Sequence, residues 1–294
     1  MRYIIMDLEW NNTYGRRING FINEVIEIGA VKLDDEFHIL DTFSCFIKSQ
    51  IGKKLRGSVK RLTNITNEDI NSGTQFTQAF AEFRRWLGPE KNVVLTWGDG
   101  DIRVLIDNYK YLNGITTIPF LSCYADLQRL FQAVYKTPSS KQVGLAAAAE
   151  MLCLKCDDYA AHRALDDSLL SAEIFKKCYD SEHLDKFMKK CDSAFYERLS
   201  FKAYAISKID NPLVDKNELN CICESCKNPA SPITEWKYSN QYFRAVFSCE
   251  LCNKKYSVGV RFKKYYDRLD IRKIYSLILD NEESVCDECA SKDQ

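Results

Sequence analysis

The 294-residue sequence has no long hydrophobic run, no net charge and only three histidines. Its longest nearly apolar stretch, 143–154, contains Glu150 and is too short to cross a membrane. The first ten residues, MRYIIMDLEW, do not have the pattern of a secretory signal, so we expect a cytoplasmic protein with no membrane partner. Because 41 Lys and Arg balance 41 Asp and Glu, any attraction to nucleic acid must come from local clusters of charge.

Cysteine is the residue that the sequence has in excess. There are 13, an odd number that cannot be fully paired as disulfides within one chain. Seven of them fall in the last 74 residues: Cys221, Cys223, Cys226, Cys249, Cys252, Cys286 and Cys289. In a reducing compartment, closely spaced cysteine pairs indicate zinc more than disulfides.

The hydrophobic pattern predicts a mixed α/β domain. Strands are predicted over 3–8, 25–33, 38–47 and 92–97, with a long polar connection over 11–21 between the first two. Helices are predicted over 76–87, 101–112, 125–135, 143–153 and 164–179. Strands first, followed by alternation of strands and helices, favour a mixed sheet with helices packed on it.

A change of composition after residue 180 predicts a second, smaller domain. The pattern over 181–210 is helical and polar, and Pro212 with the polar run 215–220 precedes the cysteine cluster. We therefore expect an α/β domain over 1–182, a helical connector over 183–215 and a cysteine-rich β domain over 216–294.

Two acids alternate along the first predicted strand. Asp7 and Glu9 lie two residues apart and project from one face, while the apolar residues Ile4, Met6 and Leu8 occupy the other. Two neighbouring carboxylates are costly to bury unless a positive charge neutralises them, and hard ions such as Mg²⁺ prefer carboxylate oxygens. The pair therefore indicates a metal site. In the alternative interpretation, residue 7 already lies beyond the sheet and both acids are solvated.

Two further pieces carry acids at positions suited to a site. Asp99 and Asp101 follow the strand at 92–97 and open a helix, where ligands bind in α/β sheets but where plain N-caps are also common. His162 is followed by Asp166 and Asp167. In a continuous helix Asp166 would share the face of His162, whereas Asp167 can point inward if the histidine precedes the helix. Such a pair can also be purely structural.

Together the three pieces resemble the DEDDh-type 3′–5′ exonucleases, the superfamily of proofreading exonucleases, RNase T and oligoribonuclease. The shared pattern is Asp-x-Glu on the first strand, an Asp in a turn before a helix, and His-x4-Asp near position 165. Segments 62–66, 126–131 and 141–145 are also similar to family segments, and the similarity extends over about residues 1–180. The start of the chain is most similar to the sporulation-inhibitor type and to the histone-mRNA exonuclease branch.

This resemblance implies an RNase H-like mixed sheet flanked by helices. It also implies a metal-dependent hydrolase that releases nucleoside 5′-monophosphates from single-stranded nucleic acid, with RNA favoured over DNA. Carried over position by position, it assigns two Mg²⁺ or Mn²⁺ ions to four acids: Asp7, Glu9, Asp101 and Asp167. His162 would be the general base. Trp10, Leu62 and Thr63 are candidate walls of a pocket for the terminal nucleotide, although each is also suited to the core.

The cysteine-rich tail predicts a structural Zn²⁺ site in a zinc-ribbon-like domain. Two Cys-x-x-Cys pairs separated by 22 residues supply four ligands: Cys223, Cys226, Cys249 and Cys252. The segment between the pairs is predicted to form a hairpin. Cys286 and Cys289 form a third pair that can replace one of the others or bind no metal, and Cys221 offers one further thiol.

A basic and aromatic stretch lies within the same tail. Between 254 and 273 there are eight basic residues and two acidic ones. Cations neutralise phosphates and aromatic rings stack on bases, so the stretch is a candidate surface for a single strand. The candidates are Arg261, Lys263, Lys264 and Tyr265. The alternative is a strand pair with an ordinary polar outer face.

Three rival functions stay open from the sequence. The chain can be a catalytically silent adaptor that works through its zinc domain, an exonuclease that acts on DNA, or a thiol redox protein that uses its cysteine pairs. The intact set of five exonuclease residues argues against the adaptor, and the ribbon-like arrangement of the cysteines argues against the redox protein.

Overall fold

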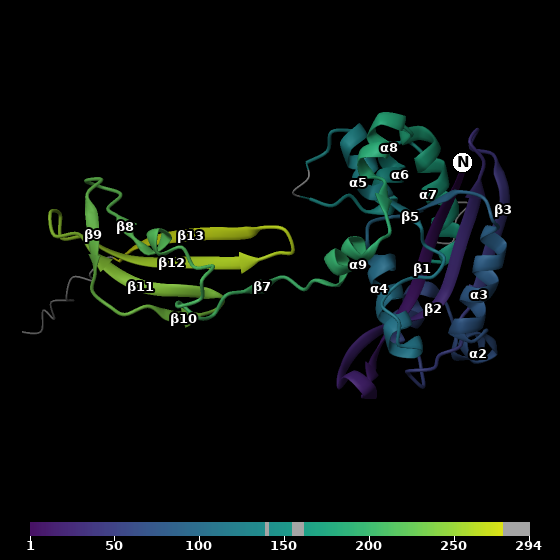
Figure 1. The fold of residues 1–294 in the computed structure, drawn as a ribbon, viewed down its shortest axis with the longest axis horizontal. Coiled ribbons are helices and arrows are strands. Elements are labelled where there is room, and N and C mark those ends of the chain that lie inside the picture. The colour runs from purple at the N-terminus through teal and green to yellow at the C-terminus, as the bar shows by residue number, and fades with distance from the viewer. Residues whose placement is uncertain (139–140, 155–161, 279–294) are drawn as a thin grey trace, which may run out of the picture. The chain divides into compact units, whose positions relative to one another are not determined.

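The computed structural model describes residues 1–138, 141–154 and 162–278, and the chain divides into two compact units (Figure 1). The first is Met1–Ser200 and the second begins at Phe201. The division falls inside the stretch 183–215 that the sequence analysis proposes as a connector. Each unit has a hydrophobic core of its own and is described by itself.

A six-stranded mixed sheet forms the centre of the first unit, in the order β3-β2-β1-β4-β5-β6. The strands are β1 (Arg2–Gly15), β2 (Gly20–Leu33), β3 (Ile39–Phe46), β4 (Asn92–Thr96), β5 (Cys123–Asp126) and β6 (Lys189–Lys190). β1 pairs antiparallel with β2 and parallel with β4, so the strand that carries the two alternating acids is central. The mixed sheet predicted from the sequence is confirmed.

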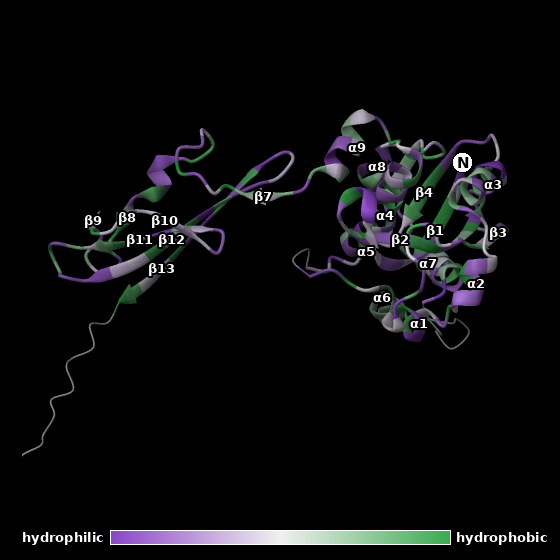
Figure 2. Cartoon of the chain, turned by 90° about the horizontal axis from the view of Figure 1, so that it is seen from below, coloured by the Kyte–Doolittle hydropathy of each residue, from purple (hydrophilic) through white to green (hydrophobic). Residues whose placement is uncertain are grey.

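Helices cover both faces of this sheet. They are α1 (Gly57–Thr63), α2 (Asn67–Ser72), α3 (Phe76–Leu87), α4 (Gly100–Asn108), η2 (Tyr109–Asn113), α5 (Leu127–Val134), α6 (Leu145–Met151), α7 (Ala164–Cys178), α8 (Ser181–Phe187) and α9 (Ser193–Ser200). Met6 and Leu8 share a core with α3 and α4, whereas Ile5 shares the opposite core with α5 and α7. Figure 2 shows β4 as largely hydrophobic, and Ile4, Ile5 and Met6 of β1 are buried beside it. Among the described residues, no helix combines the length and apolar character needed to cross a bilayer.

The first two strands are longer than the sequence suggests. The stretch 11–21, predicted as a polar connection, continues β1 and β2 as a hairpin closed by the short helix η1 (Arg16–Ile18). Asn12 pairs with Asn23 through a side-chain hydrogen bond of 2.9 Å, and Tyr14 pairs with Phe21. Because polar and aromatic side chains support this part of the hairpin, the alternation that marks a half-buried strand is absent there.

The predicted helix at 125–135 starts later than expected, because Cys123–Asp126 completes strand β5. Asp126 then caps α5 by accepting the backbone N–H of Arg129 at 3.0 Å. Asp126 is both the last residue of β5 and the N-cap of α5. Because no residues separate the strand from the helix, the sequence pattern did not show where one ends and the other begins.

The second unit is a small β domain with a seven-stranded sheet. Its elements are β7 (Tyr204–Ala205), η3 (Lys216–Leu219), β8 (Cys221–Ile222), β9 (Pro229–Pro232), β10 (Lys237–Ser239), β11 (Tyr242–Ser248), β12 (Lys255–Lys264) and β13 (Leu269–Ile278). Alternate residues of β11 and β12, among them Phe247 and Val258, form its core. β10 and β11 form the hairpin predicted between the cysteine pairs. Cys286 and Cys289 lie outside the described residues.

Candidate active site

Asp7 and Glu9 lie on the central strand of the first unit, opposite β2. Asp7 is paired with Gly29, and Glu9 with Glu27. A Cβ at Gly29 would lie 2.1 Å from the carbonyl carbon of Ala164, so the absence of a side chain allows α7 to begin directly against β2. This close approach brings the first turn of α7 beside Asp7.

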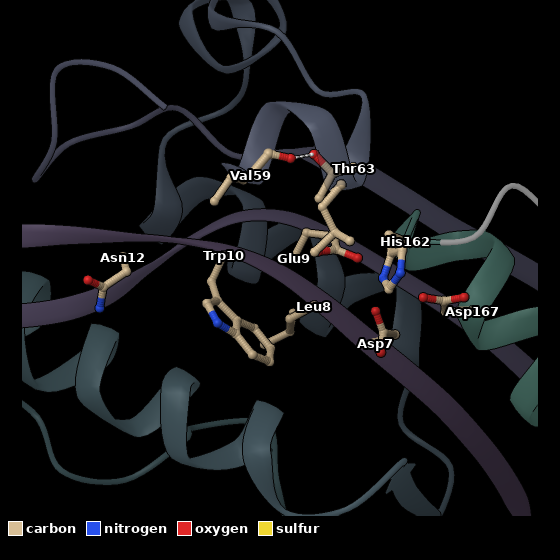
Figure 3. A pocket seen from close by; sticks show the side chains of 10 residues that line it. Asp7, Leu8, Glu9, Trp10, Asn12, Val59, Thr63, His162 and Asp167 are labelled. Carbon is tan, nitrogen blue, oxygen red and sulfur yellow. Dashed lines mark hydrogen bonds between the residues drawn. The ribbon is translucent and has the colours of Figure 1, made fainter. Parts of the chain in front are cut away.

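His162 and Asp167 come from the start of α7. Because the helix begins at Ala164, His162 precedes it, and Asp167 turns toward β1 with the histidine. One ligand atom from each of Glu9, His162 and Asp167 lies within 4.8 Å of the others. Figure 3 shows these three side chains and Asp7 gathered at one end of a pocket. Of the two alternatives left open by the sequence, His162 thus precedes the helix, and Asp167 rather than Asp166 lies beside it.

Asp101 reaches the same carboxylates from the other side of β1. It lies in the first turn of α4, is 4% exposed, and accepts the backbone N–H of Leu8 at 3.1 Å. Asp99 instead forms an ion pair with Arg103 at 2.8 Å, on the surface of the same helix. Of these two aspartates, only Asp101 is therefore bonded to the strand that carries Asp7.

The pocket beside the carboxylates has a volume of about 350 Å³. Trp10, Leu62 and Thr63, the three wall residues suggested by the sequence, all line it. Trp10 and Thr63 are labelled in Figure 3. Asn12 and Val59 also line it, and neither was singled out from the sequence. Figure 3 shows Asn12 at the end of the pocket away from Asp167, so one end is acidic and the other is not.

The close packing of carboxylates opposes their ionisation. Burial, together with the negative charges of Asp101 and Asp167, holds the pKa of Asp7 well above its usual range. Burial likewise raises the pKa of Glu9 to about 8 and that of Asp101 to about 7. A divalent cation among these groups would favour their charged forms. Several carboxylate oxygens in one place are the donor set of a hard ion such as Mg²⁺ or Mn²⁺, so the residues fit such ions.

An ion pair that the sequence analysis missed holds the segment that carries His162. Glu27, 1% exposed on β2, accepts the Arg163 Nη2–H at 2.7 Å and the Nε–H at 3.2 Å. Glu27 also accepts the backbone N–H of Ala164 at 3.2 Å. The start of α7 is thereby tied to the sheet. The signal in the sequence is an acid inside the otherwise apolar run 25–31.

Four cysteines form a second cluster, in the second unit. Their sulfur atoms all lie within 4.8 Å of one another, with 3.4 Å between Cys223 and Cys252 and 3.4 Å between Cys226 and Cys249. Thiolates about 2.3 Å from one zinc ion would be roughly 3.8 Å apart, so the cluster fits tetrahedral Zn²⁺. A hydrogen bond from the Tyr256 hydroxyl lowers the pKa of Cys223 to about 5, which favours the thiolate form that a metal binds.

The four residues of the tail that were predicted to bind single-stranded nucleic acid lie at one end of the β12–β13 pair. Arg261 and Lys263 alternate with core residues of β12, and Arg261 forms an ion pair with Asp270 at 3.4 Å. Lys264 follows on the opposite face, by the alternation of the strand. Tyr265 lies just past β12, with the Lys263 ammonium 5.3 Å from its ring centroid. The structure thus brings Arg261 and Lys263 to one face and separates Lys264 from them.

Comparison with known proteins identifies what the first unit is similar to. The RNase T family, described as exonuclease, matches residues 4–175, more than half of the chain. The chain is 31% identical over 190 residues to the probable 3′–5′ exonuclease KapD of Bacillus subtilis, a match that covers 62% of this chain and 87% of KapD. It is 28% identical over 161 residues to the human 3′–5′ exoribonuclease 1, covering 52% of this chain and 46% of that protein.

A solved structure gives the same result for the fold. The nuclease domain of 3′hExo, a DEDDh family member bound to rAMP, superposes with a TM-score of 0.53 and is 26% identical. The match covers 60% of this chain and 90% of that domain. The sheet and helices of the first unit therefore have the RNase H-like exonuclease fold.

Proposed function

The chain belongs to the RNase T exonuclease family as a DEDDh-type 3′–5′ exonuclease, and from this premise we propose that it removes nucleoside 5′-monophosphates stepwise from single-stranded RNA. The observation that carries the proposal is the convergence of four acids and a histidine beside one pocket. Asp7, Glu9, His162 and Asp167 line the pocket. Asp101 accepts the backbone N–H of Leu8 and is close enough to Asp7 for its negative charge to raise the pKa of Asp7.

Exonucleases of this family use divalent metals, and the four acids are the residues that would hold them here. When bound, two Mg²⁺ or Mn²⁺ ions would stabilise the negative charge that develops on the attacking and leaving oxygens of the phosphodiester. The raised pKa values of Asp7, Glu9 and Asp101 support this assignment, because a cation relieves the repulsion that causes part of each shift.

His162 is our proposed general base. It is exposed at the edge of the pocket, beside Asp167, and its neighbour Arg163 is fixed by Glu27. A histidine imidazole is the side chain most often used to accept a proton in catalysis, so His162 is suited to take the proton of an attacking water molecule. This ion pair, with Glu27 buried and Arg163 partly exposed, ties the segment to the sheet and so would keep the imidazole near the carboxylates.

The pocket would hold the terminal nucleotide. Trp10 offers a ring, Leu62 an apolar surface and Thr63 a hydroxyl already bonded to the Val59 carbonyl at 3.0 Å. A volume of about 350 Å³ is on the scale of a site for one small ligand. RNA is our preferred substrate because the similar proteins include a human exoribonuclease and a nuclease domain bound to rAMP.

We assign a supporting role to the second unit. Its four clustered cysteines would hold a structural Zn²⁺, and Arg261, Lys263 and Tyr265 would add contacts to a single strand. Lys264 is a weaker candidate because it lies on the other face of β12.

Matched 5′-labelled single-stranded RNA and DNA test this function. With Mg²⁺ or Mn²⁺ we expect RNA to shorten from its 3′ end, and we expect the reaction to stop in EDTA and in Asp7→Ala. His162→Ala should lose about 10²–10⁴-fold in rate, the usual contribution of general base catalysis. Faster loss of DNA would correct the substrate. No degradation of either strand, with binding and zinc content intact, would favour an adaptor instead.

A further inference from the structure

The first unit carries a concentration of cations that the active site does not use. Segments 10–23 and 42–67 contain two and six Lys or Arg residues respectively, eight in all, and no Asp or Glu. This is unusual in a chain whose net charge is zero. The first segment forms the tip of the β1–β2 hairpin, and the second runs from the end of β3 through α1. The two segments meet in space, as the following contacts show.

Buried polar side chains of the hairpin fix the loop that carries these cations. Glu24, 2% exposed, accepts the backbone N–H groups of Ile51 at 2.6 Å and Gly52 at 2.8 Å, and the Ser49 hydroxyl at 2.8 Å. A Cβ at Gly52 would lie 2.6 Å from the Thr13 hydroxyl oxygen, so the loop is in close contact with β1. Because the buried Glu24 carboxylate accepts four hydrogen bonds from the loop, the loop has a defined conformation.

A second anchor sets the position of the next residues. Asn11, 1% exposed, accepts the backbone N–H of Arg56 at 3.0 Å and donates to the Lys54 carbonyl at 3.3 Å. On the side of the loop these bonds use backbone groups only, and the side chains of Lys53, Lys54 and Arg56 are exposed. The loop therefore carries three exposed cations within four residues, held in place by the hairpin.

Aromatic rings lie next to these cations. The Arg56 guanidinium is 5.3 Å from the ring centroid of Phe21, which is 64% exposed. The Tyr14 ring, 47% exposed, meets Phe21 edge to face at 5.8 Å. Exposed rings beside cations are the combination that single-stranded nucleic acid binds, since bases stack on rings and phosphates pair with cations.

This surface begins where the active-site pocket ends. Arg56 directly precedes α1, whose residues Val59 and Leu62 line the pocket. On β1, Asn12 lines the pocket and Tyr14 follows two residues later. Tyr14 is seven residues beyond Asp7, roughly 23 Å along an extended strand, so the surface is several nucleotides away from the carboxylates.

We propose that the hairpin-loop surface, formed by Tyr14, Phe21, Lys53, Lys54 and Arg56, binds nucleotides upstream of the 3′-terminal one in a single-stranded substrate. The inference rests on the proposed function, because it gives the strand that enters the pocket a path beyond it. The cations contact the phosphates of the upstream segment, and Phe21 stacks on one of its bases. A dinucleotide is too short to reach this surface.

Cleavage of a long and a short substrate by the full-length chain tests the surface. For the triple variant K53A/K54A/R56A we expect kcat/KM on a 20-nucleotide RNA to fall about tenfold relative to kcat/KM on a dinucleotide. The slope of the logarithm of the binding constant against the logarithm of salt concentration should become smaller by about 2, because three phosphate contacts are lost. Phe21→Ala should weaken binding of the 20-mer without changing that slope. The control K177A/K186A/K190A removes three exposed lysines of the same unit outside this surface and should keep the wild-type ratio.

The outcomes separate this inference from the catalytic proposal. If the wild type cleaves neither RNA, binding of the 20-mer by fluorescence anisotropy still compares the variants, and weaker binding by the triple variant supports the surface. Equal binding of the 20-mer by wild type and triple variant overturns it, as does an equal loss on both substrate lengths. If the triple variant loses affinity for polyglutamate alone, the surface serves an acidic protein and the inference is wrong.

Discussion

At the carboxylate site, hydrogen bonds and burial act in opposite directions on the pKa of individual side chains. Asp101 accepts the N–H of Leu8, which favours its charged form, yet burial outweighs this bond and raises its pKa to about 7. The pKa of Glu9 is raised to about 8, because the negative charges of Asp167 and Glu27 add to the effect of burial. The folded chain therefore holds protons on acids that would be ionised in the unfolded chain.

The stability of the protein without Mg²⁺ or Mn²⁺ should fall as the pH rises from 5 to 9. Over this range the folded state binds more protons than the unfolded state, because the pKa values of Asp101 and Glu9 are raised to about 7 and about 8, so the free energy of unfolding decreases with pH. Urea unfolding at each pH measures the trend. Added Mg²⁺ should flatten it, and Glu9→Gln should flatten it without metal. A free energy that rises with pH in the metal-free protein would contradict the shifts.

At the scale of the element, the site depends on how α7 meets β2. Gly29 lets the helix backbone approach, and the Ser168 hydroxyl donates to the Gly29 carbonyl at 3.0 Å. The Glu27–Arg163 pair fixes the residues just before the helix. One strand segment therefore sets the position of both His162 and Asp167.

Gly29→Ala should weaken both the fold and the activity. The added Cβ would lie 2.1 Å from backbone atoms of Ala164, and overpacking of this kind costs about 1–3 kcal/mol or more. We expect a lower thermal unfolding midpoint together with a loss in kcat, because α7 must move away from Asp7. Gly144→Ala, where a Cβ meets nothing within 4 Å, is the matched control and should be close to neutral. Unchanged stability and activity in Gly29→Ala would show that α7 is seated differently.

The elements that sequence reasoning predicted well are those whose pattern reflects their own burial. The helix at 76–87 was predicted from apolar residues at helical spacing, and α3 has those bounds with Phe80 and Phe83 buried. The alternation along β1 likewise predicted that Asp7 and Glu9 share one face, but that face also buries Ile5 in a second core. The helical signal was clear because α3 buries one stripe of side chains against one core.

The parts that the sequence analysis missed depend on partners far away in the chain. Glu24 is satisfied by a loop about 26 residues later, and Glu27 by Arg163, 136 residues later. Neither spacing leaves a local pattern. The hairpin beyond Asn11 was missed because its pairing is supported by polar and aromatic contacts, which resemble those of a loop in sequence.

At the scale of the whole molecule, two units with separate cores share one chain. The family match ends at residue 175, within the first unit, so the second unit is an addition to the exonuclease fold. Its core is small and includes Cys223 and Cys249, with Cys226 and Cys252 packed against it. A metal bound by these cysteines would add folding free energy to a domain with so small a core.

Removal of zinc should unfold the second unit selectively. Purified protein should contain at least one zinc per chain, and Cys249→Ser should lose it because one of four ligands is missing. Trp236, which packs on Phe247, should then report local unfolding by fluorescence, while cleavage of a dinucleotide by the first unit persists. Protein that carries disulfides between these cysteines and no zinc would instead favour a redox role.

The identity of the product tests the central claim most directly. Single-stranded RNA with a 5′ label is incubated with the full chain and Mn²⁺ in H₂¹⁸O, and the products are resolved by electrophoresis and mass spectrometry. We expect nucleoside 5′-monophosphates that carry one ¹⁸O in the phosphate, together with a 5′-labelled ladder that shortens one nucleotide at a time, both absent in Asp7→Asn. Nucleoside 3′-monophosphates, internal fragments as first products, or a wild-type reaction matched by Asp7→Asn would contradict the account.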